Sequence, residues 1–503
     1  MSTVPQPVPR VVWFKRDLRL YDHAPLLAAA REGPVLPLFV AEPGYWALPD
    51  TSYRHWAFLS GAVADLAERI AEREGRLIVR TGDAVEVLRA LREAIGPFAL
   101  HAHEETGNWW TYDRDRRVRA WCRDTGTPFA EEPQYGVQRG ARLDRDRWAR
   151  DWERAVTRPL LPVPALRWID GGDGFASEPI PAPEALGLTH DGIAWMQEPG
   201  REAALATLRG FLHERGETYR RAMSSPLAGA DACSRLSVHF TAGSVSMREC
   251  YQATVRRREA IAALPEHERG QWAQALQSFV GRLHWHCHFM QKLETEPELE
   301  WRPMARAYEG MRPPPEPETL ERFAEGRTGY PFVDACMRSL RAVGWINFRM
   351  RAMLMSFASY DLWLPWQHGG MVLARLFTDY EPGIHWTQSQ MQSGETGINA
   401  VRIYSPVKQG HDQDPDGLFI RRWVPELAHL EGRALHEPWT LPALPKGYPE
   451  RMVDHAIAAR EAKNRIQAVR REPDARAEAE AVFERHGSRK PRRTRRPPVR
   501  KAA

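Results

Sequence analysis

Short apolar runs alternate with longer amphipathic segments over residues 10–130. Residues 11–14, 35–40 and 76–79 have the length and composition of buried strands, and residues 24–31 and 53–74 repeat their apolar positions at helical period. This β-α-β-α order predicts an α/β domain built on a doubly wound parallel sheet. No G-x-G-x-x-G follows the first run, so a nucleotide would have to bind in another way or elsewhere.

The rest of the chain has a different pattern. Nearly every segment from residue 202 to about 422 has helical period, which predicts an all-α domain, and residues 131–200 are rich in Pro, Gly and Asp, which is typical of a connector. Residues 451–485 read as one charged helix that leads into a basic tail. We therefore expect an α/β domain over 1–130, a linker over 131–200, a helical domain over 201–450, and a charged helix with a disordered tail over 451–503.

Charge and cysteine usage exclude several classes of protein. No apolar stretch approaches the roughly 18–20 residues of a membrane span. The five cysteines are scattered without a C-x-x-C pair, which favours a reducing cytoplasm over a disulfide framework or an iron–sulfur cluster. Residues 489–501 carry eight basic residues and no acid, so this tail either binds polyanions or serves only to keep the protein in solution.

Three segments place charged or hydroxyl side chains where ligands commonly bind. Residues 13–20 follow the first strand, where charges line a ligand crevice or simply pair with one another. Residues 233–237 set hydroxyls beside Arg235, which suits a phosphate or a plain helix cap. Arg349 and Arg351 lie in an apolar helical segment and need a counter-charge, for which Asp379 and Glu381 are the candidates.

Polar residues interrupt the helical domain again between 383 and 406. A Gly-punctuated stretch of this kind is typical of a binding loop rather than of core. His284 and His288 share one helical face, as zinc ligands at i and i+4 do, but no third ligand accompanies them and we predict no metal.

Four ordered segments resemble the photolyase/cryptochrome family. Residues 13–20 (W-F-K-R-D-L-R-L) resemble its opening W-F-R-R-D-L-R-L, and residues 329–338 resemble its G-Y-P-x-V-D-A-x-M-R. Residues 344–351 resemble G-W-x-H-N-R-x-R, and residues 412–427 resemble the closing D-P-D-G-x-Y-I-R-R-W-V-P-E-L. Each segment alone is modest, but together they cover about residues 10–430 and are very specific.

The resemblance implies FAD in the helical domain. Arg351 and Asp379 would form the ion pair beside the flavin ring, and the protein would bind damaged DNA, with Arg349 and Arg402 on flanking phosphates. An antenna chromophore of folate or deazaflavin type would bind in the first domain, with His103, Glu104, Glu105 and Asn108 as candidates. The other residues placed at FAD are Tyr219, Ser234, Arg235, Leu236, Ser237, Arg282 and Glu381.

The departures from the family lie at its substrate cavity and its electron route. Ser278 and Gly281 stand where repair enzymes of the family have Glu and Trp. Ala352 stands where the family has a Met, although Met353 follows directly. Trp366 matches the family's middle Trp. The outer Trp position falls at Pro313, and the inner one falls near Ser389, with Trp386 three residues away. The expected substrate pocket is Ser278, Phe348, Met353 and Met391.

His385 falls near the position that faces flavin N5 in the family. It would donate a hydrogen bond there or become charged near neutral pH, or it would cap a helix and not meet the ring. With Trp366 and Trp386 it completes the expected catalytic set.

The function that the resemblance implies is blue-light repair of pyrimidine dimers by electron transfer from reduced FAD. We prefer the cyclobutane dimer, because residues 344–348 contain no His that could donate a proton to a (6-4) lesion. A cryptochrome photoreceptor without repair and a (6-4) photolyase remain the alternatives. We expect a cytoplasmic monomer that acts on damaged DNA and not on membranes.

Overall fold

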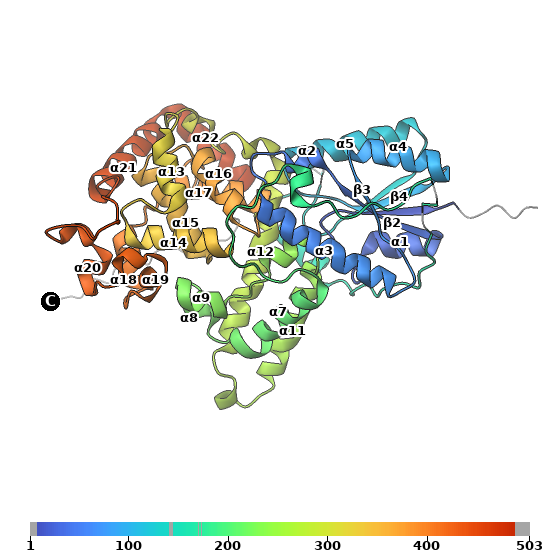
Figure 1. Cartoon of the computed structure of the whole chain (residues 1–503), viewed down its shortest axis with the longest axis horizontal. Coiled ribbons are helices and arrows are strands. Elements are labelled where there is room, and N and C mark those ends of the chain that lie inside the picture. The colour runs from blue at the N-terminus through green and yellow to red at the C-terminus, as the bar shows by residue number, and fades with distance from the viewer. Residues whose placement is uncertain (1–7, 140–143, 170, 173, 488–503) are drawn as a thin grey trace, which may run out of the picture.

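The computed structural model describes residues 8–139, 144–169, 171–172 and 174–487, so the basic tail over 489–501 lies outside the described residues. Five strands form one parallel sheet in the order β3-β2-β1-β4-β5. In Figure 1 this α/β part lies to the right and the helical part to the left and below. The strands are β1 (Arg10–Phe14), β2 (Val35–Ala41), β3 (Ile78–Thr81), β4 (Ala99–His103) and β5 (Phe129–Glu132).

The strand order reverses direction at β1, which pairs with β2 on one side and with β4 on the other. Trp13 lies opposite both Leu38 and Ala102 in this register. A doubly wound sheet opens a crevice at such a point, beyond the carboxyl ends of its strands. The covering helices are α1 (Ala24–Glu32), α2 (Pro43–Trp46), α3 (Tyr53–Ala71), α4 (Ala84–Ile95) and α5 (Trp109–Asp124).

The predicted doubly wound sheet is confirmed, with boundaries that differ by one to three residues and with β3 shifted by two at each end. The connector is more structured than expected. It contains α6 (Trp148–Thr157), and Trp148 and Trp152 are buried against α11 (Met247–Ala262) and α12 (Trp272–Thr295). These two large rings lie on one face of α6 and pack the short helix against the core of the helical part.

The helical part surrounds α12, which lies across the middle of the molecule in Figure 1 and packs against α11 and α17. No helix of the described residues is long and apolar enough to cross a membrane. The other helices of this part, apart from the last two, are α7 (Arg201–Gly210), α8 (Tyr219–Ala222), α9 (Pro226–Ala232), α10 (Ser237–Ala242), α13 (Pro317–Glu325), α14 (Pro331–Val343), α15 (Phe348–Ser356), α16 (Trp366–Leu376), α17 (Pro382–Ser393), α18 (Pro406–Gln413), α19 (Leu418–Trp423) and α20 (Gly432–His436).

The single charged helix expected over 451–485 is wrong. The chain forms α21 (His455–Arg471) and α22 (Pro473–His486), which break at Glu472. Proline cannot donate the hydrogen bond that would continue a helix, and it disfavours helical geometry in the residue before it. Pro473 therefore ends α21 and begins α22. His486 at the end of α22 contacts Glu296 after α12 at 2.7 Å, which returns the end of the described chain to the centre of the molecule.

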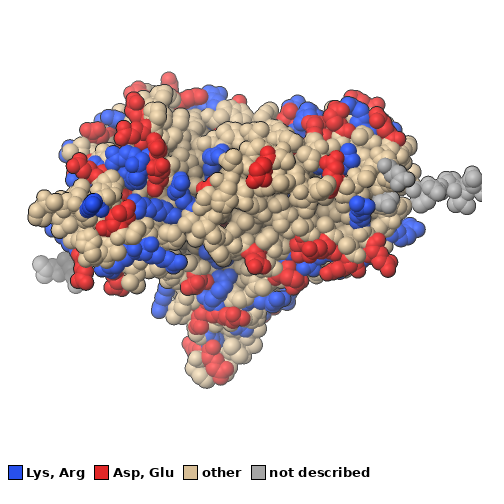
Figure 2. Space-filling view, viewed as in Figure 1, with Lys and Arg blue, Asp and Glu red and all other residues tan. Residues whose placement is uncertain are grey.

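Basic and acidic side chains are interspersed over the face seen in Figure 2. Neither sign of charge forms a continuous patch over this face.

Candidate functional site

A cavity of about 410 Å³ lies between α8, α12, α15 and α17; we refer to it as the large cavity. Its volume is within the roughly 300–1,000 Å³ of typical cofactor sites. Its lining includes Tyr219, Ser234, Arg235, Ser237, Arg282, Phe348, Arg349, Arg351, Ala352, Asp379, Glu381 and His385. Most of the residues that the resemblance placed at FAD are therefore side by side.

Arg351 and Asp379 meet in this cavity. The Arg351 guanidinium donates two hydrogen bonds to the Asp379 carboxylate, at 3.0 and 2.9 Å, and a third to the Ile346 carbonyl at 2.7 Å. Burial alone would raise the pKa of Asp379, but Arg351 outweighs it and the pKa is lowered. The expected counter-charge of Arg351 is thus Asp379, held in the bidentate geometry that fixes orientation best.

Glu381 has a different partner from the one expected. Its carboxylate lies 3.0 Å from the guanidinium of Arg16, which follows β1, and not on either arginine of α15. Arg16 also binds Glu105, at 3.0 Å. Glu381 still lines the large cavity, so this chain of contacts ties the wall of the cavity to the sheet.

The segment before α10 supplies hydroxyls and one guanidinium to the cavity. Arg235 has a φ of 61°, an uncommon region for any residue with a side chain, and its guanidinium lies 4.0 Å from the Trp345 ring centroid. Ser234 and Ser237 line the cavity beside it. Leu236 was expected at FAD, but its side chain is fully buried in the apolar core with Leu212 and Phe240 and does not line the cavity.

His385 lies in the wall of the large cavity and is buried. Its Nε2 is 2.8 Å from the carbonyl oxygen of Gly370, and a carbonyl only accepts, so Nε2 carries the proton. Burial lowers the pKa of His385 to about 4. The ring is therefore neutral at pH 7 with Nδ1 as an acceptor, which corrects the expectation that it donates to a ligand or becomes charged.

Trp366 and Trp386 form a buried aromatic pair behind this wall. Their ring centroids are 5.7 Å apart at 72°, and the His385 ring lies 4.8 Å from that of Trp386. Ser389, at the family's inner Trp position, lines the cavity instead. The rings of Trp366 and Trp386 thus contact each other, and His385 connects Trp386 to the cavity.

A second cavity of about 380 Å³ adjoins the first and shares Arg282, Trp285 and Phe348 with it; we refer to it as the side cavity. Met391 and Arg402 line it, as expected for substrate-pocket and DNA-contacting residues. None of the described residues in its lining is an Asp or a Glu.

Two residues of the expected substrate pocket lie elsewhere. Ser278 donates to the Gln274 carbonyl of its own helix at 2.8 Å and lines neither cavity. Met353 is fully buried in the core with Met350 and Leu354. One helical residue turns the side chain by about 100°, so Ala352 reaches the large cavity and Met353 does not.

Sequence reasoning missed three side chains of α12 that line the side cavity. Trp285, Phe289 and Lys292 follow Arg282 at helical spacing and share its face. That spacing was visible in the sequence once Arg282 had been singled out.

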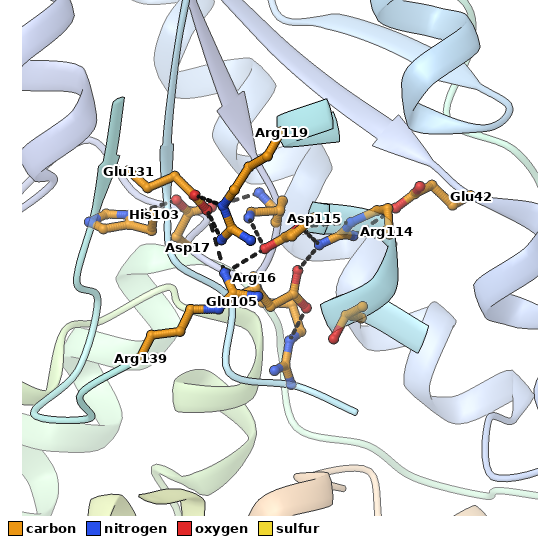
Figure 3. A network of polar contacts seen from close by, with 12 residues as sticks. Arg16, Asp17, Glu42, His103, Glu105, Arg114, Asp115, Arg119, Glu131 and Arg139 are labelled. Carbon is orange, nitrogen blue, oxygen red and sulfur yellow. Dashed lines mark hydrogen bonds and ion pairs between the residues drawn. The ribbon is translucent and has the colours of Figure 1, made fainter. Parts of the chain in front are cut away.

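The crevice beside β1 is filled by charged side chains, drawn in Figure 3. Arg114 binds Glu42 at 2.7 Å and Asp115 at 2.8 Å, and Arg139 also binds Asp115 at 2.8 Å. The space left between Arg16, Glu42, Glu105 and Arg114 is about 70 Å³, well below a typical cofactor site.

Three of the four antenna candidates are engaged with the protein itself. His103 Nδ1 lies 2.7 Å from Asp17, and Glu105 pairs with Arg16 and Arg114. Asn108 accepts a hydrogen bond from Thr111 at the start of α5. His103, Glu105 and Asn108 are thus held by contacts within the α/β part of the protein.

Two family models match the chain. The model described as DNA photolyase matches residues 10–135, and that described as FAD binding domain of DNA photolyase matches residues 279–468. The deoxyribodipyrimidine photo-lyase of Streptomyces griseus is 31% identical over 468 residues, which cover 89% of this chain and 97% of that protein. The cryptochrome DASH of Natronomonas pharaonis is 28% identical over 476 residues, which cover 88% of this chain and 98% of the other.

The fold has solved relatives. The crystal structure of a class III photolyase from Agrobacterium tumefaciens superposes with a TM-score of 0.80 at 25% identity and covers 94% of this chain and all of its own.

Proposed function

The chain belongs to the photolyase/cryptochrome family, and we propose that within this family it is a DNA photolyase that splits cyclobutane pyrimidine dimers under blue light. The observation that carries this proposal is the shared wall between the two cavities. Arg282 and Phe348 line both, so a ligand in the side cavity lies directly against a cofactor in the large one.

The residues of the large cavity fit FAD. The Arg351–Asp379 pair offers a fixed polar edge for a flavin ring, and Tyr219, Ser234, Arg235, Ser237 and Arg282 offer donors for its phosphates. When bound, FAD supplies the light-absorbing electron donor. Trp386 and Trp366 would carry electrons between this cofactor and the protein surface.

The side cavity would hold the damaged bases after they leave the DNA stack, which costs least for a lesion that already stacks poorly. Arg402 is exposed beside this cavity, and Arg349 is half-buried in the wall of the large one. We propose that both contact phosphates on either side of the lesion, where they position the strand without reading its sequence. Phe348, 45% exposed, and Met391 supply apolar contacts for the bases.

The preference for the cyclobutane lesion rests on the fact that no described residue at the shared wall is a histidine that is protonated at neutral pH. Asn347 stands where the family has His, and its amide donates to the carbonyls of Met223 and Ser224 at 3.0 and 2.9 Å. Burial lowers the pKa of His288, which lines the side cavity, to about 2. Neither side chain therefore donates a proton to the lesion at neutral pH.

A cryptochrome photoreceptor is the second candidate, favoured by the loss of aromatic residues at the cavity. Gly281 stands where the family's repair enzymes have a Trp. The same fold and cofactor would then serve signalling, with no lesion bound.

The experiment is a repair assay on oligonucleotides that carry a cyclobutane dimer or a (6-4) lesion, with reduced protein under blue light and in the dark. We expect light-dependent loss of the cyclobutane dimer only. Arg402→Gln should weaken binding of damaged DNA, whereas Arg433→Gln, an exposed arginine paired with Glu437, should not. Repair of neither lesion in the light would favour the cryptochrome function.

A further inference from the structure

Lys292 is a buried cation without an acidic partner. It lies in the last turn of α12, is 7% exposed, and lines the side cavity. In the part of the chain that the structure describes, no acceptor or carboxylate binds its ammonium, which lies 5.4 Å from the Phe289 ring centroid. Burial of an unpaired charge is unfavourable, so such a group suggests a ligand that completes it.

Arg145 adds a positive charge near Lys292, and two histidines that are neutral at pH 7 lie beside it. His288 is one turn before it on α12, His486 comes from α22, and Arg145 precedes α6. Glu296, one turn after Lys292, is already bound by His486 and Arg306 at 2.7 and 2.8 Å. Burial first, and then Arg145, lower the pKa of Lys292 to about 8, so the ammonium is largely charged at pH 7. The charged and titratable groups that interact with Lys292 are Arg145, His288 and His486.

Aromatic side chains flank the same cavity. The rings of Trp285 and Phe289 stack at 5.4 Å and 26°, and Trp285 is 39% exposed. Phe348 is also exposed, on the wall shared with the large cavity. Apolar faces beside a deep cation suit a planar ring that carries electron-rich oxygen atoms, because the ring stacks while the oxygens accept hydrogen bonds.

We propose that Lys292 is the lesion-recognition cation of this protein: its ammonium donates hydrogen bonds to carbonyl oxygens of the damaged pyrimidines, whose rings lie along Trp285. This inference rests on the proposed function, since it takes the damaged bases as the occupant of the side cavity. Lys292 transfers neither a proton nor an electron. It lies where negative charge develops when the damaged bases accept an electron, and a fixed cation stabilises such charge best in a site shielded from water.

The depth of Lys292 separates its role from that of Arg402. Arg402 is exposed and can reach the phosphates of a strand that stays outside, whereas Lys292 is reached only by a group that enters the cavity. Loss of Arg402 should therefore weaken the binding of damaged and undamaged DNA alike, and loss of Lys292 should weaken the binding of the damaged strand only.

The test compares dissociation constants for a short single strand with one cyclobutane dimer and for the same strand undamaged, in the dark, by fluorescence anisotropy. Lys292→Met should lower the preference for the damaged strand by about tenfold or more, the effect of one hydrogen bond to a charged group, while Lys292→Arg keeps most of it. Lys292→Gln serves as a second neutral variant. Lys408→Met, at an exposed lysine paired with Asp412, is the matched control and should change nothing.

The pH dependence gives a second readout. The preference of the wild type should decline above about pH 8, where Lys292 loses its charge, and that of Lys292→Met should be flat over the same range. FAD content should be equal in all variants, because Lys292 does not line the large cavity.

The outcomes separate this inference from the proposed function. If Lys292→Met and Lys292→Gln keep the full preference and its pH dependence, the inference is overturned, and light-driven repair by the wild type would still establish the photolyase. If recognition depends on Lys292 but no repair occurs in the light, Lys292 is confirmed and the repair function is overturned. A wild type that binds both strands equally at every pH overturns the inference.

Discussion

Arg351 on α15 and Asp379 before α17 form a bidentate ion pair at 3.0 and 2.9 Å, in which the carboxylate is buried and the guanidinium remains 24% exposed toward the large cavity. Asp379 thus holds Arg351 in one orientation and leaves an edge of it free for a ligand. The pair joins α15 to the segment before α17, so it contributes to the shape of the cavity as well as to its charge.

Removal of the Asp379 carboxylate should cost both stability and FAD affinity. Asp379→Ala leaves the Arg351 charge without its partner, at roughly 3–5 kcal/mol. The exposed pair of Lys408 and Asp412 provides the control, and Asp412→Ala should change the free energy of unfolding by less than about 1 kcal/mol. Urea unfolding and FAD titration measure the two effects. Equal FAD dissociation constants in the two variants would show that the Asp379 pair is not part of the cofactor site.

The prediction of this pair from the sequence succeeded because it followed from a requirement. A guanidinium in an apolar helix needs an acid, and the family motif pointed to Asp379 as that acid. The same reasoning failed for Glu381, whose partner Arg16 is 365 residues away in the sequence. No spacing rule connects residues of two domains, so that contact could be found only in the structure.

Local patterns predicted the elements better than the cavities. The first strands and α12 follow directly from apolar periodicity, and the break at Pro473 could have been recognised from the proline alone. The role that we propose for Lys292 could not be found from the sequence, because it depends on the lack of an acidic partner among the residues that the structure describes. Absence of a contact depends on every element that surrounds a residue, here α6, α12 and α22.

His385 should make the protein less stable in acid. Burial lowers its folded pKa from 6.5 to about 4, so the unfolded chain binds a proton that the folded chain does not. Stability from this residue is therefore full above pH 6.5 and is lost as the pH falls toward 4, by roughly 2.5 kcal/mol at pH 4.5. His385→Asn, which can still donate to Gly370, should show a loss smaller by that amount between pH 7.5 and 4.5 in urea unfolding. An equal loss in both proteins would mean that His385 is not buried as a neutral ring.

The aromatic pair should determine how fast light reduces bound FAD. Trp386→Phe removes the ring that lies 5.7 Å from Trp366 and 4.8 Å from His385, so electrons from the surface should reach the cofactor more slowly. Bleaching of the flavin absorption under blue light with an added thiol measures the rate. Trp195→Phe, at a tryptophan that is 54% exposed, should bleach at the wild-type rate. If all three proteins bleach equally fast, electrons take another route.

The basic tail should strengthen binding to DNA of any sequence. Residues 489–501 carry eight positive charges, and each phosphate neutralised contributes about −0.9 to the slope of log affinity against log salt for duplex DNA. Deletion of residues 488–503 should flatten that slope and leave FAD content unchanged. A tail of equal length with every Lys and Arg replaced by Gln controls for chain length and should behave like the deletion. An unchanged slope would mean that the tail only keeps the protein in solution.

Two helical glycines near the cavities should respond to alanine in opposite directions. A Cβ at Gly281 on α12 would meet no atom within 4 Å, so Gly281→Ala loses only the extra freedom of the unfolded glycine and should stabilise the protein by about 0.5–1 kcal/mol. A Cβ at Gly370 on α16 would lie 2.9 Å from a ring carbon of Trp386 and 3.3 Å from the Ser389 hydroxyl. Gly370→Ala should therefore destabilise by about 1–3 kcal/mol and displace Trp386, which near-UV circular dichroism would detect.

The open space at Gly281 also bears on function, because a ring occupies this position in the family's repair enzymes. If Gly281→Ala proves neutral to cofactor content, to light reduction of FAD and to binding of damaged DNA, then the position serves no contact in this chain, and Trp285 one turn later is the aromatic residue available to the side cavity. A loss of damaged-strand binding in Gly281→Ala with unchanged stability would instead show that the lesion itself fills the space, in close contact with the α12 backbone.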